Sequence, residues 1–264
     1  MRKLISLLLG LSLCFVLPAS GQLAGHIGIE RKAGLVEPAF PSVTGIKTHF
    51  KANGQGFVAD TAIGSTWTDL VSAYNFSQAT GSLQPIYRAA PTGFNSWPAL
   101  QFDGVDDKLA NATNAFNDVG TAAGTIYAVV RVNTNHADTG NPWTNDTGYA
   151  GAVRYGLHFY TNVLQAFGYD GANKIATTAI TTGTTYIARV RWDSTNLGVR
   201  INNAAETTTA CGALTTGNTD FTTGKYSTNT LDGWISEIVT LNASVSAGDD
   251  TNLLTYFNTK YMIY

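Results

Sequence analysis

The sequence predicts an all-β protein: a two-sheet antiparallel β-sandwich with one short C-terminal helix. Short apolar or alternating segments recur from about residue 44 onward, and turn-forming residues separate them. Charged residues make up only 13% of the chain, whereas glycine occurs 27 times, a balance that favours strands and tight turns over surface helices. A helical period is found near the C-terminus, which predicts a single helix there.

The first 43 residues stand apart from this pattern. Residues 1–21 begin with Arg2 and Lys3, continue with the apolar run LISLLLGLSLCFVL and end in small residues, the three parts of a secretory signal peptide. We expect cleavage before Gln22, a secreted or cell-surface protein, and no transmembrane anchor in the mature chain. The alternative is an apolar strand that stays on the chain. Residues 22–43 carry two prolines and no lasting period, which indicates a linker or an arm that packs on another surface.

The domain is expected to span residues 44–264, and its strands follow from local patterns. GTIYAVVRVN (124–133) is apolar on both faces, which is typical of a central strand covered on both sides. The other strands outside hairpins are expected in TGIKTHFKA (44–52), PALQF (98–102), DKLA (107–110), DFTTGKYS (220–227) and LDGWISEIVTL (231–241).

Hairpins are predicted in the second half of the chain. YGLHFYT and NVLQAFGYD should pair around Thr161 and Asn162, and the Asp170–Gly171 dipeptide is a strong hairpin signal. TTYIARVRWD (184–193) and LGVRINN (197–203) should pair around residues 194–196.

The predicted helix begins near residue 246. Ser246 and Asp249 resemble a capping box with Asp in place of the usual Glu. One apolar face then recurs at helical spacing through Leu253, Leu254, Phe257 and Tyr261.

Four segments together resemble a known superfamily: STWTDL (65–70), LQPIYRAAPTGFNSWPALQFDGVDDKL (83–109), ARVRWDSTNLGVRINN (188–203) and LDGWISEIVTLNASVSAGDDTNLLTYFNTKY (231–261). Their order is similar to that of the concanavalin A-like, laminin G-like jelly rolls, of the non-catalytic bacterial or phage type. The resemblance implies a jelly-roll sandwich and extracellular binding or display more than chemistry. VSAYNFSQ (71–78) departs from the Asn-Gly-rich spacing usual there, so that loop should differ in shape. Tryptophans in the shared motifs are expected to be largely buried: Trp67, Trp97, Trp192 and Trp234.

Three acids cluster in a chain that is poor in charge: Asp103, Asp106 and Asp107. We favour a structural role, because an Asp side chain can accept a hydrogen bond from the backbone two residues on and hold a turn at Asp103–Gly104. The alternative is a calcium site, since calcium takes six to eight oxygen ligands. The loop spacing of an EF-hand is absent. Calcium is therefore the only cofactor that the sequence suggests, and it is not required.

Residues 133–149 form the longest polar loop of the sequence, and they offer a candidate ligand site. Aromatic rings cover the apolar side of a sugar ring, while amides and carboxylates bind its hydroxyl groups. The candidate residues are His136, Asp138, Asn141, Trp143, Asn145, Asp146 and Tyr149. The alternative is a solvated loop with Trp143 packed into the core.

The remaining patterns argue against chemistry and against nucleic acid. Glycosidases of this fold carry alternating acids on one strand, but none of the four glutamates here has an acid two residues away. A formal net charge of −2 does not favour binding to phosphate. We therefore expect no enzyme, but a module that binds a glycan or a surface protein. The alternative is a structural or display protein that forms homo-oligomers or part of a virion, and a glycoside hydrolase acting through Glu237 comes third.

Overall fold

The structure is a computed structural model, and it describes residues 36–111, 119–134, 143–145, 155–215, 221–226 and 229–264. By internal contacts the chain divides into Met1–Glu30 and Arg31–Tyr264, and every described element belongs to the second unit. The predicted signal peptide and residues 22–35 of the predicted arm lie outside the described residues. Within the described ranges, no helix is both long and apolar enough to cross a membrane.

Nine strands of the described chain form the larger sheet, and their pairings are antiparallel. In spatial order they are β15 (Thr207–Ala210), β14 (Asn196–Ile201), β13 (Thr185–Trp192), β8 (Gly124–Val132), β19 (Asp232–Leu241), β6 (Ala99–Asp103), β5 (Ile86–Arg88) and β2 (Thr61–Ala62), with β1 (Ile46–Lys51) paired to β19. The prediction of a central strand is confirmed, because β8 lies between β13 and β19 and is buried along nearly all of its length.

Eight strands form the second, also antiparallel sheet. In order they are β12 (Asn173–Ala179), β11 (Val163–Tyr169), β10 (Tyr155–Tyr160), β9 (Trp143–Asn145), β16 (Phe221–Thr223), β7 (Leu109–Asn111), β4 (Phe76–Ser77) and β3 (Thr66–Trp67). The strands β17 (Lys225–Tyr226) and β18 (Asn229–Thr230) pair separately, and a 3₁₀ helix, η1 (Gly81–Leu83), precedes β5.

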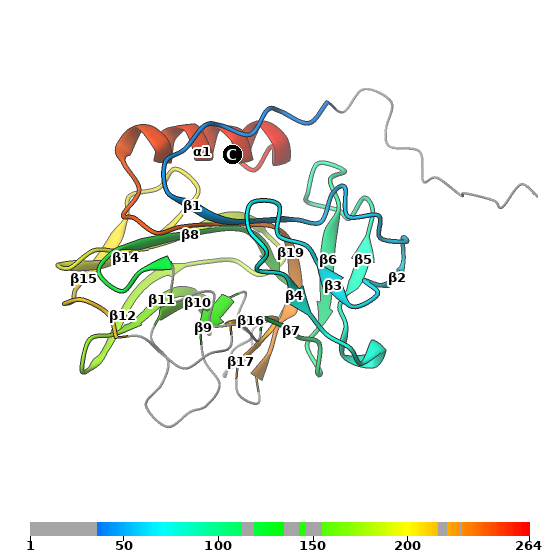
Figure 1. Ribbon diagram of the computed structural model, residues 1–264, viewed down its shortest axis with the longest axis horizontal. Helices are drawn as coiled ribbons and strands as arrows, with labels where there is room; N and C mark the ends of the chain where they lie inside the picture. The colour runs from blue at the N-terminus through cyan, green and yellow to red at the C-terminus, as the bar shows by residue number, and fades with distance from the viewer. Residues whose placement is uncertain (1–35, 112–118, 135–142, 146–154, 216–220, 227–228) are drawn as a thin grey trace, which may run out of the picture. The chain divides into compact units, whose positions relative to one another are not determined.

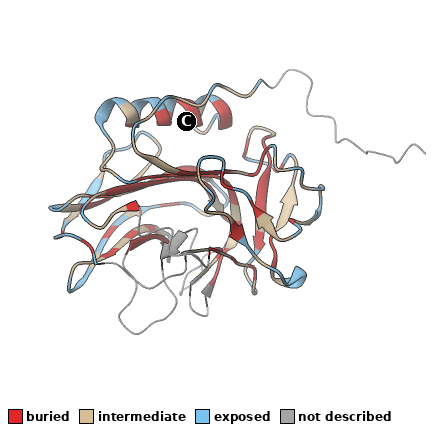
Figure 2. Ribbon diagram, viewed as in Figure 1, coloured by how far each residue is buried: buried red, intermediate tan, exposed pale blue. Residues whose placement is uncertain are grey.

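The two sheets pack face to face over one apolar core, which confirms the predicted β-sandwich (Figures 1 and 2). Phe102 and Ile126 from the larger sheet share this core with Leu157 and Leu164 from the second sheet, and all four are fully buried. Burial of large apolar side chains stabilises the domain without help from a disulfide: Cys211 is a free, buried thiol.

The C-terminal helix α1 (Ala247–Tyr261) covers the outer face of the larger sheet (Figure 1). Its N-cap is the predicted one, because the Ser246 hydroxyl accepts a hydrogen bond from the Asp249 amide at 3.1 Å. The predicted apolar face is buried as expected and packs with Tyr127 and Val129 of β8 in a second core cluster. Beneath α1 the larger sheet is therefore covered on both faces.

A β-bulge in β19 changes which side chains reach this helix. The register between β19 and β8 shifts between Ile235 and Glu237. Ile235 and Ile238 contribute to the inner core, whereas both Ser236 and Glu237 hydrogen-bond to α1 on the outer side. Two successive side chains on one face require the extra residue of a bulge, since a regular strand alternates.

The predicted hairpins are confirmed, with their turn chemistry. β10 pairs with β11 through Thr161 and Asn162, which both have positive φ (34° and 62°), as a two-residue hairpin turn requires. β11 pairs with β12 across Gly171. β13 pairs with β14, and the Asp193 carboxylate accepts from backbone amides of the connecting turn.

Several predictions need correction. DFTTGKYS is not one strand: it divides at Gly224 (φ 87°) into β16 and β17, which belong to different sheets. The segment 133–149 is not loop throughout, because β9 lies within it. Trp67, Trp97 and Trp192 are buried as expected, whereas Trp234 is only partly buried and packs against the second core cluster.

Candidate functional site

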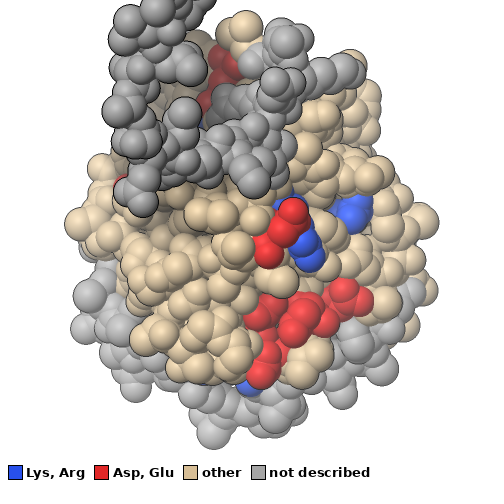
Figure 3. Space-filling view, turned by 90° about the vertical axis from the view of Figure 1, so that its right-hand side faces the viewer, with Lys and Arg blue, Asp and Glu red and all other residues tan. Residues whose placement is uncertain are grey.

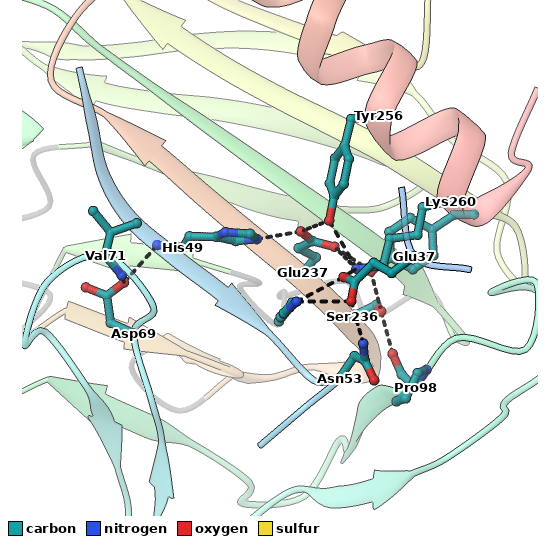
Figure 4. A network of polar contacts seen from close by, with 12 residues as sticks. Glu37, His49, Asn53, Asp69, Val71, Pro98, Ser236, Glu237, Tyr256 and Lys260 are labelled. Atoms are coloured by element: carbon teal, nitrogen blue, oxygen red, sulfur yellow. Dashed lines mark hydrogen bonds and ion pairs between the residues drawn. The ribbon is translucent and has the colours of Figure 1, made fainter. Parts of the chain in front are cut away.

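Glu237, the acid singled out for the enzyme alternative, lies in a buried network between β19, β1 and α1 (Figure 4). Its Oε1 accepts from His49 Nε2 at 2.6 Å and from the Tyr256 hydroxyl at 2.9 Å. Its Oε2 accepts from Lys260 Nζ at 2.8 Å and from the Tyr261 hydroxyl at 2.7 Å. Both carboxylate oxygens are thus held by protein donors, and the residue has no exposed surface.

The charge of this carboxylate is stabilised by its neighbours. Burial alone would raise the pKa of Glu237, but the Lys260 charge and the hydrogen bond from His49 outweigh it and lower the pKa to about 2. Burial, and then the charge of the same carboxylate, raise the pKa of the Tyr256 hydroxyl well above its usual range. The network is a buried, internally neutralised ion pair that ties α1 to the sheet, and a substrate would have to open the core to reach Glu237.

The second acidic group is the acidic turn, defined as residues 103–107, between β6 and β7. Asp103 Oδ1 accepts from the amides of Val105 (2.8 Å) and Asp106 (3.3 Å), and Asp107 Oδ2 accepts from the Asp103 amide at 2.9 Å. Asp103 therefore holds the turn as predicted. The Asp106 carboxylate accepts no hydrogen bond from the described residues, so the bonds that hold the turn come to Asp103 and Asp107.

These three carboxylates also lie close enough for a shared cation. One oxygen of each of Asp103, Asp106 and Asp107 lies within 4.8 Å of the others. Burial, together with the charges of Asp103 and Asp106, raises the pKa of Asp107 to about 6, although the hydrogen bond from the Asp103 amide acts in the opposite direction. A carboxyl group with a pKa near 6 gives the turn a proton acceptor that titrates in a mild pH range.

Asp232 brings the acidic turn together with the start of the predicted polar loop. It lies opposite Asp103 in the β6–β19 register. Its carboxylate accepts from Asn133 Nδ2 at 2.9 Å and from the Thr134 hydroxyl at 2.6 Å. A Cβ on Gly104 (φ 76°) would lie 2.7 Å from the Cβ of Asp232, so this approach requires glycine. Figure 3 views the side on which β5 and β6 lie and shows acidic side chains gathered there in one band.

Trp234 lies two residues further along β19, on the same sheet face. Its indole Nε1 donates to Asn133 Oδ1 at 3.1 Å, and the Arg131 guanidinium lies over the ring, 4.9 Å from its centroid. Gln101 is its register partner on β6 and accepts from Arg88 Nε at 2.8 Å. We call this group the polar corner, defined by Gln101, Asp103, Asp106, Asp107, Arg131, Asn133, Thr134, Asp232 and Trp234.

Arg131 differs from the other described arginines. Arg88, Arg189, Arg191 and Arg200 each form an ion pair with a carboxylate, whereas Arg131 forms none with a described residue. It donates to the Thr92 carbonyl, and its Nε, like those of Arg189 and Arg200, is buried without a hydrogen-bond partner among the described atoms. Burial lowers the pKa of Arg131, which is consistent with a cation that has lost water without gaining a counter-charge.

The sequence-predicted loop residues are only partly placed. Trp143 and Asn145 lie on β9, opposite Leu157 of β10 and Phe221 of β16 in register. The other five lie outside the described residues: His136, Asp138, Asn141, Asp146 and Tyr149. Asn133, Arg131, Gln101 and Asp232 were not singled out from the sequence. The available signal was strand alternation, which puts Asp232 and Trp234 on one face.

Comparison with protein-family models gave no match, and comparison with curated proteins gave none either. Among solved structures, the chain is similar to Trypanosoma rangeli sialidase in complex with sialic acid, with a TM-score of 0.59, 13% identity, 84% of this chain covered and 34% of that one. Trypanosoma rangeli sialidase in another structure gives 0.58, 14%, 87% and 36%. This likeness shows the fold alone. The chain spans about a third of the length of these sialidase chains.

Proposed function

We propose that this chain is a non-catalytic, secreted or cell-surface module of the concanavalin A-like jelly-roll type, and that it binds carbohydrate at the polar corner. The observation that carries the proposal is Trp234. Its partly buried indole lies on a sheet face among amide, hydroxyl, carboxylate and guanidinium groups. An aromatic ring covers the apolar side of a sugar, and such polar groups bind sugar hydroxyls.

The contacts of the corner favour binding by a preorganised surface. Asn133 is held at both ends, because it accepts from Trp234 and donates to Asp232. The Arg131 guanidinium lies over the indole ring and is itself held by its bond to the Thr92 carbonyl. Side chains that are already oriented lose little entropy when a ligand binds.

The state of the acids supports the non-catalytic part of the proposal. Glycoside hydrolysis by two carboxyl groups needs one on each side of the scissile bond, separated by roughly 5 to 9.5 Å. Glu237 is buried with both oxygens bonded, and the carboxylates of the acidic turn converge within 4.8 Å on one side. Neither group leaves a pair of carboxyls facing each other across an open site.

The test is a glycan array followed by calorimetry on the full chain, with neutral and sialylated glycans. Sialylated probes are included because the similar sialidase holds sialic acid. Trp234→Ala should weaken binding at least tenfold and Asn133→Ala several-fold. Tyr160→Ala, an exposed aromatic at the end of β10 on the other sheet, is the matched control and should bind as wild type does. Failure of the chain to bind any glycan would reject carbohydrate binding and favour a display or virion role.

A further inference from the structure

The described part of the arm, residues 36–43, is bound to the domain by side chains alone. It forms neither helix nor strand, and it runs alongside α1 over the outer face of the larger sheet (Figure 1). No main-chain hydrogen bond joins it to the rest of the described chain. It therefore lies on the domain as a bound peptide would.

Glu37 makes the polar half of this contact (Figure 4). Its Oε1 accepts from Lys260 Nζ at 2.7 Å and from Lys51 Nζ at 3.0 Å. Its Oε2 accepts from Asn53 Nδ2 at 2.8 Å and from Lys51 Nζ at 3.1 Å. The two lysines hold the pKa of Glu37 below its usual value although burial opposes them. Three side chains of the domain thus converge on one carboxylate.

Phe40 makes the apolar half, three residues later. Its ring stacks on His49 with centroids 4.2 Å apart and meets Tyr256 edge-on at 5.0 Å. Val43 also packs on the second core cluster. The arm therefore contacts the domain through a Glu-x-x-Phe pattern. Prolines at 38 and 41 restrict the backbone conformations that the arm can adopt when it is unbound.

The surface under the arm, formed by His49, Lys51, Asn53, Tyr256 and Lys260, is called the seat. Without Glu37 the seat would hold two lysines against the single carboxylate of Glu237. The seat is thus an unfilled carboxylate site beside an aromatic one whenever the arm leaves. Gly45 (φ 81°) lies two residues after the end of the arm, and its carbonyl accepts a hydrogen bond from the Asn242 amide, which anchors the chain close to the point where an arm would pivot.

We propose that the seat binds residues 36–43 of a second copy of this chain, so that copies associate by exchanging arms. The chain's own arm matches the seat group by group, which makes a second copy the occupant with fitting chemistry. An exchanged arm makes the same contacts in trans as in cis, so exchange costs little and depends on protein concentration.

Charge reversal in full-length chains tests the exchange. Glu37→Lys alone repels the arm from its own seat, and Lys51→Glu alone does the same. In a one-to-one mixture, each variant's arm finds a complementary seat only on the other chain. Light scattering during size-exclusion chromatography should give the monomer mass for each variant alone and about twice that mass for the mixture. The Glu37→Lys/Lys51→Glu chain restores the ion pair within one chain, so it should give the same mass as wild type.

A mixture that keeps the monomer mass would overturn the exchange, provided that circular dichroism shows both variants folded. If either variant does not fold, a second measurement decides. A labelled peptide of residues 36–45 is titrated into full-length Glu37→Gln/Phe40→Ala, whose own arm is weakened. Binding at least tenfold tighter than that of the same peptide with Gln at 37 supports the seat. Equal or absent binding of the two peptides rejects it.

Discussion

The two acidic groups of this protein use similar residues for opposite purposes. Glu237 is buried, and each of its oxygens meets a cationic or hydroxyl donor from α1 or β1. The acidic turn is only partly buried: Asp103 is exposed, Asp106 is half-buried and Asp107 is buried. Its three carboxylates lie close together, and those of Asp103 and Asp107 accept hydrogen bonds from backbone amides. The pKa moves accordingly: neighbours lower that of Glu237 to about 2, and burial with like charges raises that of Asp107 to about 6.

The acid that is more deeply buried and fully hydrogen-bonded is therefore the poorer candidate for function. A carboxylate with no free lone pair and no exposed surface can hold a helix on a sheet but offers nothing to a ligand. The turn and the neighbouring Trp234 keep part of their surface available. Function is therefore expected at the polar corner and stability at the Glu237 network, and five predictions test this division.

The largest effect is expected at Glu237. Glu237→Ala leaves His49, Tyr256 and Tyr261 without their buried acceptor, which should cost about 3–5 kcal/mol of unfolding free energy. Chemical denaturation measures it, and Asp106→Ala, which removes a carboxylate that accepts no hydrogen bond from the described residues, is the control with little expected change. Comparable losses in the two variants would contradict the division.

The same network predicts an acid-side dependence. Because the folded-state pKa of Glu237 lies near 2, below its usual 4.5, its contribution is present above about pH 4.5 and is lost as the pH falls through 2. Between about pH 4.5 and 2, the unfolding free energy of Glu237→Gln should therefore fall less than that of wild type.

The second effect compares two tryptophans, one from each region. Trp97 is buried and lies under the Lys260 ammonium, so Trp97→Ala should cost about 3–5 kcal/mol. Trp234 is only partly buried, and Trp234→Ala should cost on the order of 1–2 kcal/mol. Thermal unfolding gives the ranking, and a larger loss at Trp234 would show that the polar corner is a structural core.

The fold could be predicted from the sequence, but only part of the Glu237 network and of the polar corner could. Strand patterns, turn residues and helical spacing predict β8, the hairpins and α1, because each of these elements depends on residues that are neighbours along the chain. The bulge at Ser236 depends on how β19 pairs with β8, and the ion pair of Glu37 with Lys260 joins residues that are distant in the sequence. Neither can be predicted from a local sequence pattern. Asp103 was recognised as a turn residue because its bonds are local, whereas Asp232 becomes visible only once β6 and β19 are paired.

The third effect is a pH dependence centred on Asp107. With a folded-state pKa of about 6 against a usual 3.8, the folded protein binds more protons than the unfolded one between these values. Stability should therefore fall as the pH rises from about 4 to 6. Asp107→Asn should remove this fall, and Asp106→Asn should reduce it, since one of the two neighbouring charges is gone. Melting temperatures measured at intervals from pH 4 to 7 would contradict the prediction if wild type and Asp107→Asn ran parallel.

The smallest expected effect concerns calcium at the acidic turn. Asp103 Oδ1 and Asp107 Oδ2 already accept amide hydrogen bonds, and a calcium ion would need six to eight oxygens in place of them or beside them. We expect equal melting temperatures in excess calcium and in excess chelator. Asp103→Ala should cost about 1 kcal/mol in both buffers, because it removes local backbone bonds. A bound ion would act differently: it would raise the wild-type melting temperature by mass action and, by holding Asp107 ionised, would abolish the fall between pH 4 and 6. A calcium-dependent rise that disappears in Asp107→Asn would turn the acidic turn from a structural element into a metal site of the polar corner.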